Sequence, residues 1–126
     1  SDALHYLLTK IGLALTETGG DLYLSGLDEA QLQTKAGEDL AKLQKKLGKN
    51  VFVKILCHKN QSNGLVFQNV QKKVIADTIP LVPCFVYRNR VAVVILKNPV
   101  HVAILYNEEL AESHIQLFNH LWNTVK

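Results

Sequence analysis

The sequence predicts a three-layer α/β domain in which a mixed sheet of about five strands lies between helices. In the first half, the order strand, helix, strand predicts a parallel βαβ unit. In the second half, three short apolar runs separated by turn-forming residues predict an antiparallel meander. The 126 residues, of which 48% are hydrophobic, have the length and composition of one globular domain, assigned here to residues 1–126.

The first half of the chain supplies two helices and two strands. Leucine and isoleucine recur at helical spacing over residues 2–16, which predicts an amphipathic helix. Residues 21–25 alternate in polarity and predict a short strand. Asp28 is expected to cap a second helix over about residues 28–47. Residues 51–57 are almost all apolar, which predicts a strand buried on both faces, as in a parallel sheet.

The middle of the chain is less regular. The run Asn-Gln-Ser-Asn-Gly at residues 60–64 predicts a loop. Valines four residues apart within residues 65–77 predict a helix of about three turns. Two prolines exclude a central strand over residues 79–83, because proline has no N–H to donate to a neighbouring strand.

The second half predicts three strands and a last helix. The strands are expected at residues 84–87, 90–96 and 100–106, and the breaks between them contain Arg, Asn, Lys and Pro, which favour turns. Asn107 is expected to cap the final helix, because two glutamates follow it where the helix dipole favours negative charge.

Composition excludes several classes of protein. The 14 Lys and Arg exceed the 11 Asp and Glu by only three charges, too few to predict nucleic-acid binding on their own. No apolar run approaches the ~18 residues of a membrane span. Cys57 and Cys84 form no disulfide framework and are expected to be buried thiols in a cytoplasmic protein. The chain has no methionine, and we expect further residues before Ser1 in the full protein.

Residues 79–122 carry a further pattern. It consists of Ile79-Pro80, the run Phe85 to Leu96, Val102-Ala103-Ile104, Asn107 to Ser113, Phe118 and Leu121-Trp122. This pattern resembles the C-terminal domain of TrmB-type and related prokaryotic transcriptional regulators, a domain similar to one half of the phospholipase D fold. The resemblance implies a regulatory domain that dimerises or senses a ligand, preceded by a winged helix-turn-helix module that binds DNA.

The phospholipase D likeness can be tested for catalysis at every histidine. Those enzymes use His-x-Lys-x4-Asp, in which histidine is the nucleophile and lysine stabilises the charge of the phosphate. Two positions after the five histidines stand Leu7, Asn60, Ala103, Gln116 and Trp122. Because none of these is lysine, we predict a domain that is not an enzyme, and we expect no catalytic residue, cofactor or metal.

Four residues are candidate ligand contacts. Ser25 and His58 lie at the carboxyl ends of the two predicted parallel strands, where open α/β sheets bind ligands. Tyr87 and Arg90 flank the first hairpin turn, where the arginine fork can hold a carboxylate or phosphate. The alternatives are an ordinary loop histidine and exposed turn residues.

Phe118 and Trp122 are candidate dimer-interface residues. They lie on the last helix, and large aromatic side chains commonly anchor interfaces, although burial in the core is an equal alternative. The sequence therefore predicts a non-catalytic, homodimeric domain of a cytoplasmic transcriptional regulator, with a small-molecule effector as its candidate ligand. DNA would be bound by the preceding module, and no membrane partner is expected. A degenerate phosphodiesterase or nuclease, and a protein-interaction module without a ligand, are the alternatives.

Overall fold

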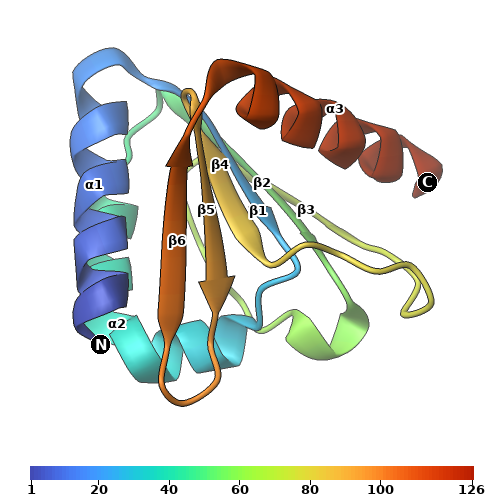
Figure 1. Cartoon of the computed structure of the whole chain (residues 1–126), viewed down its shortest axis with the longest axis horizontal. Helices are drawn as coiled ribbons and strands as arrows, with labels where there is room; N and C mark the ends of the chain where they lie inside the picture. Colours follow the sequence, from blue (N-terminus) through green and yellow to red (C-terminus); the bar gives the residue numbers. More distant parts are fainter.

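A six-stranded mixed sheet forms the middle layer of the molecule, and helices cover both of its faces (Figure 1). The computed structural model describes all residues from Ser1 to Lys126. Its elements are α1 (Asp2–Thr18), β1 (Gly20–Ser25), α2 (Glu29–Lys46), β2 (Val51–Cys57), the 3₁₀ helix η1 (Lys59–Gln61), β3 (Val70–Val74), β4 (Cys84–Tyr87), β5 (Arg90–Ile95), β6 (His101–Tyr106) and α3 (Glu108–Thr124). The three-layer α/β class is as the sequence predicts, with six strands in place of about five.

The strands follow the order β3-β2-β1-β4-β5-β6 across the sheet. β1 pairs in parallel with β2, and β2 in parallel with β3, while β4, β5 and β6 run antiparallel to their neighbours. The βαβ unit and the meander are therefore both confirmed. β3 and β6 are the two edge strands.

The helix predicted over residues 65–77 is wrong, because this segment contains strand β3 instead. A spacing of four residues is two periods of a strand, so the valines also fit one side of an extended chain. β2 offers β3 a full row of parallel partners, from Val53 with Val70 to Cys57 with Val74. Pairing with the neighbouring strand thus overrides the local pattern.

The prediction that β2 is buried on both faces is wrong at its amino-terminal end. Phe52 is 57% exposed, whereas Val51 and Val53 on the opposite face are buried. The opposite face is covered by α1 and α2 together, but only α3 covers the face that Phe52 shares. One helix is too narrow to cover six strands.

Two predicted caps are confirmed. The Asp28 carboxylate accepts hydrogen bonds from the backbone N–H groups of Ala30 and Gln31, at 3.1 and 3.2 Å. The Asn107 side chain accepts one from Leu110 at 2.8 Å. Each cap provides a partner for N–H groups that the first turn of a helix leaves free.

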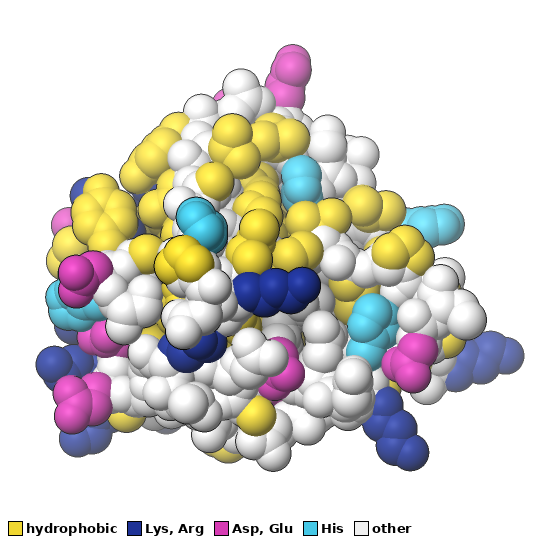
Figure 2. All heavy atoms as spheres, turned by 60° about the horizontal axis from the view of Figure 1, so that its bottom comes forward, with side chains coloured by type: hydrophobic (Ala, Val, Ile, Leu, Met, Phe, Trp, Pro, Cys, Tyr) yellow, Lys and Arg dark blue, Asp and Glu magenta, His cyan; other side chains and the backbone are white.

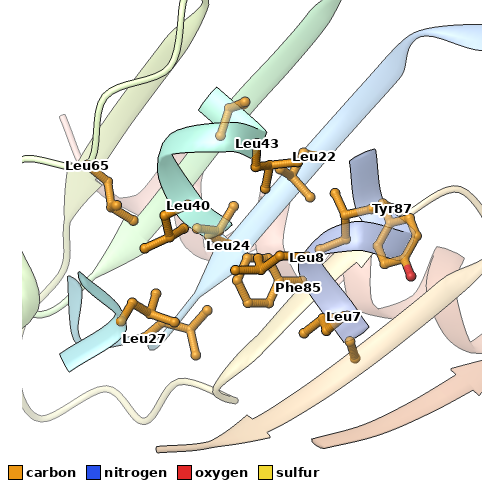
Figure 3. Close-up of a cluster of buried hydrophobic side chains, with 14 of the residues drawn as sticks. Leu7, Leu8, Leu22, Leu24, Leu27, Leu40, Leu43, Leu65, Phe85 and Tyr87 are labelled. Carbon is orange, nitrogen blue, oxygen red and sulfur yellow. The ribbon is translucent and has the colours of Figure 1, made fainter. Parts of the chain in front are cut away.

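The sheet separates two hydrophobic cores. The larger one, of 24 buried residues, packs α1 and α2 against one face, and Figure 3 shows leucines of both helices around Phe85. The smaller one, of 9 buried residues, packs α3 against the other face. No helix combines the length and the hydropathy that crossing a bilayer requires.

Candidate functional site

The structure divides the four candidate ligand residues between opposite ends of the sheet. Ser25 is paired with Leu56 of β2, so it lies beside the end of β2 from which His58 follows. Tyr87 is paired with Leu22 of β1 and with Arg90 of β5. Leu22 lies three residues before Ser25 on β1, so Tyr87 and Arg90 lie toward the other end of the sheet. The four candidate contacts therefore form two separate pairs.

His58 is occupied by contacts within the chain. Its Nε2 lies 2.7 Å from the carbonyl oxygen of Ile79, and its backbone N–H donates to Oε1 of Gln61 at 3.0 Å. Because a carbonyl oxygen can only accept, Nε2 carries the proton and donates it to Ile79. His58 therefore links residues 59–61 to residue 79, and its Nε2 is not free to bind a ligand.

The carboxyl end of β1 is also covered. Gly26 has a φ of +61°, and a Cβ added there would lie 2.9 Å from Cβ of Leu81. Glycine is required here because it adopts this φ without strain and lets residues 81–82 approach. Ser25 lines a mainly apolar hollow of about 40 Å³ between α3 and residues 80–82, which is too small for more than a water-sized group.

Tyr87, Arg90 and Tyr106 form a compact group at the other end of the sheet, which we call the Arg90 cluster. The guanidinium carbon of Arg90 lies 4.9 Å from the ring centre of Tyr106 and 5.6 Å from that of Tyr87. The register places Arg90 directly between the two tyrosines, on neighbouring strands. Both distances are within the range of cation–π contacts, so the rings hold the guanidinium in place.

The Arg90 guanidinium has no anionic partner. The carboxylates of Glu29 and Asp39 are engaged elsewhere, by Lys72 and by His5, and neither contacts Arg90. Its Nε is buried without a hydrogen-bond partner, as is the hydroxyl of Tyr87. In Figure 3 the Tyr87 oxygen points away from the labelled leucines. A guanidinium without a counter-ion is a ready partner for an oxyanion.

The Tyr87 hydroxyl remains protonated at neutral pH. Burial is the main cause that raises the pKa of Tyr87 to about 12; the Arg90 charge opposes the rise, and the neighbouring Tyr106 and Tyr6 add to it. A protonated phenol beside a cation can donate a hydrogen bond to an anion. Lys10 adds a second cation to this region, with its Nζ 5.4 Å from the ring centre of Tyr6.

Phe118 and Trp122 belong to the smaller core. Their rings stack with centres 5.6 Å apart, and Phe118 meets Tyr23 edge-on at 5.1 Å. The Nζ atoms of Lys54 and Lys73 lie over the Trp122 ring at 5.4 and 5.0 Å. The structure thus uses both rings to attach α3 to the sheet, which corrects the expectation that they form a surface for a partner.

The sequence interpretation missed a buried charged pair. Glu29 is 1% exposed, and its Oε1 accepts from Lys72 Nζ at 2.7 Å and from the backbone N–H groups of Asn63 and Leu65 at 2.9 Å each. These contacts join the start of α2 to β3 and to the preceding loop. The missed signal is a carboxylate directly after a helix cap, although its partner 43 positions away is set by the fold.

The two thiols are buried and protonated. Burial raises the pKa of Cys84 to about 11, and burial followed by the Glu29 charge raises that of Cys57. Thiolates rather than thiols are nucleophiles, so neither cysteine is activated. No three His, Cys, Asp or Glu side chains lie close enough together to hold a metal ion.

Comparison of the chain with protein-family models, curated proteins and solved structures finds no match.

Proposed function

We propose that this chain is a non-catalytic dimerisation and effector-sensing domain of a transcriptional regulator, and that its effector is a small anion bound at the Arg90 cluster. The effector carries a carboxylate or a phosphate, because the planar guanidinium matches either group through two parallel hydrogen bonds. The unpaired, ring-held guanidinium of Arg90 is the observation that supports this proposal most directly.

The Arg90 guanidinium is held in place before any ligand binds, which favours a binding role for it. A free arginine side chain loses about 2 kcal/mol of rotamer freedom when it is fixed in one geometry. In the Arg90 cluster the rings of Tyr87 and Tyr106 already restrict the guanidinium. An anion that binds there pays less of this cost, so even a small ligand can gain useful affinity.

Such a domain would control DNA binding by changing the relative populations of two dimer arrangements. An anion that binds one arrangement of a dimer more tightly than another shifts the dimer toward that arrangement. The DNA-binding part of the proposal rests on the resemblance of residues 79–122. It assigns DNA contact to a winged helix-turn-helix module attached before α1, whose spacing in the dimer the effector would change.

The ligand claim is tested by titrating the ¹⁵N-labelled protein with inorganic phosphate, and separately with acetate, at constant ionic strength. The side-chain Nε–H signal of Arg90 should shift and saturate with at least one of the two anions. Arg90→Gln should abolish the saturable shifts of neighbouring backbone signals. Arg88→Gln, an exposed arginine in the same hairpin turn, should retain them.

A linear shift without saturation, or saturable shifts that persist in Arg90→Gln, would refute binding at this cluster. Arg90→Lys separates geometry from charge. It keeps the positive charge but loses the fork, so we expect binding about tenfold weaker or worse.

A further inference from the structure

The β6 edge of the sheet is unprotected, unlike the β3 edge. Edge strands invite pairing with another chain, and proteins commonly block them with lysine or proline. β3 carries Lys72 and Lys73 at its centre, whereas β6, His-Val-Ala-Ile-Leu-Tyr, contains no lysine, arginine, acid or proline. The difference indicates that the β6 edge is the more open of the two edges to a partner strand.

The outward backbone groups of β6 can be assigned from the ladder. The Asn107 N–H donates to the carbonyl oxygen of Asn89 at 2.9 Å, one position beyond the pair formed by Arg90 and Tyr106. Bonded and non-bonded pairs alternate along an antiparallel ladder. Val102, Ile104 and Tyr106 therefore direct their N–H and C=O groups away from β5, where this chain offers them no partner.

The side chains around this edge are apolar on the face that α3 leaves uncovered. Leu105 is 45% exposed and Ile95, on the adjacent strand, is 47% exposed. Ala103 between them is exposed as well. In Figure 1 β6 is the nearest strand; in Figure 2 this front edge is turned upward, where hydrophobic side chains gather and few charged ones lie.

The charges at the two ends of β6 select the partner and its direction. Lys97 lies in the turn before β6, and Glu108 and Glu109 start α3 directly after it. In an antiparallel pair of two β6 strands, the start of one strand lies beside the end of the other. Lysine of each copy then approaches glutamate of the other, at both ends of the seam, so the edge is complementary to itself.

We propose that a second copy of this chain pairs with β6 in antiparallel fashion, with the two-fold axis at Ile104, so that one sheet continues through both copies. This inference rests on the dimerisation part of the proposed function and names its surface. Ile104 faces itself and Val102 faces Tyr106 of the second copy, so that the outward groups form about six backbone hydrogen bonds. Because Tyr106 belongs to the Arg90 cluster, an anion bound there lies at the seam and can bias the pairing.

The test is sedimentation velocity of the protein over a range of micromolar concentrations. The wild type should dimerise, and Ala103→Lys should weaken dimerisation at least tenfold, because pairing would desolvate a new charge at the centre of the seam. Gln71→Lys places the same charge on an exposed position of β3, and it should dimerise as the wild type does.

A charge-reversal series tests the direction and does not alter the strand. Lys97→Glu should weaken the dimer several-fold, and adding Glu109→Lys in the same chain should restore it. A parallel pair or a different surface gives no such rescue. This series also decides the matter if Ala103→Lys fails to give the wild-type circular dichroism spectrum.

The outcomes separate this inference from the proposed function. A dimer that Ala103→Lys leaves unchanged overturns the β6 surface and leaves a dimeric sensor with another interface. A wild type that stays monomeric at every concentration overturns both the β6 pairing and the dimerisation part of the proposed function. The Arg90 titration then decides the ligand part independently, because that cluster is contained within one chain.

Discussion

Removing the Glu29 carboxylate should be the most damaging single change to the folded chain outside the large apolar residues. In Glu29→Ala the ammonium of Lys72 and the N–H groups of Asn63 and Leu65 all lose their acceptor. Breaking a buried ion pair from one side costs about 3–5 kcal/mol. The Lys72 side chain is 22% exposed and can turn toward water, which lowers the cost of its own charge.

The N–H groups of Asn63 and Leu65 set a lower limit on the stability that Glu29→Ala loses. A buried donor without an acceptor costs about 1–3 kcal/mol, and the Leu65 N–H is buried. We therefore expect a loss of about 3–4 kcal/mol for Glu29→Ala. With a typical urea m-value of about 1–3 kcal/mol/M, the unfolding midpoint should fall by about 2 M.

The assay is urea unfolding followed by fluorescence of Trp122, the single tryptophan, which is buried on α3. Glu29→Gln keeps an acceptor for the two N–H groups and should lose about half as much stability. Glu38→Ala removes an exposed glutamate from the same helix, and its free energy of unfolding should stay within ~0.5 kcal/mol of the wild type. If Glu29→Ala behaved like Glu38→Ala, the carboxylate could not be the link between α2 and β3.

Three other predictions follow from single contacts. Asp28→Ala should cost about 1 kcal/mol in urea unfolding, because two N–H groups lose their cap, and an unchanged midpoint would contradict the role of Asp28. Phe118→Ala should cost about 3–5 kcal/mol, and a smaller loss would mean that α3 packs loosely on the sheet. For Cys84, the folded pKa of about 11 lies above the ordinary 9.0, so the unfolded chain loses its proton first as pH rises. The protonated Cys84 thiol therefore contributes its full stabilisation of the folded state below pH 9, and this contribution is lost as the pH rises toward 11. Cys84→Ala should therefore lose about 2 kcal/mol less than the wild type between pH 8 and 10.5, and parallel losses would refute this.

Features that depend on one residue and its near neighbours in the chain were predicted correctly from the sequence. Asp28 and Asn107 cap helices because a short polar side chain reaches N–H groups two or three positions later. The hairpin strands at 84–87 and 90–95 form from apolar runs joined by a two-residue turn. For these features the interacting groups are close in the chain, so the rest of the fold has little influence on them.

The candidate site was predicted in part. Tyr87 and Arg90 face each other because a two-residue hairpin turn fixes their pairing, which the sequence shows. Tyr106 completes the cluster only through the pairing of β5 with β6. Ser25 and His58 were placed at the correct end of the sheet, but residues 79–82 cover that end, and such a distant contact leaves no local signal.

The sequence by itself determined the α/β class, the parallel and antiparallel halves, the helix caps and the pairing of Tyr87 with Arg90. The tertiary structure alone decided that residues 70–74 are a strand, that Phe118 and Trp122 are core, that Glu29 meets Lys72, and that β6 is an open edge. The physical reason is range. Periodicity, capping and turns act over a few residues, whereas burial, ion pairing and edge position depend on which distant segments share a sheet.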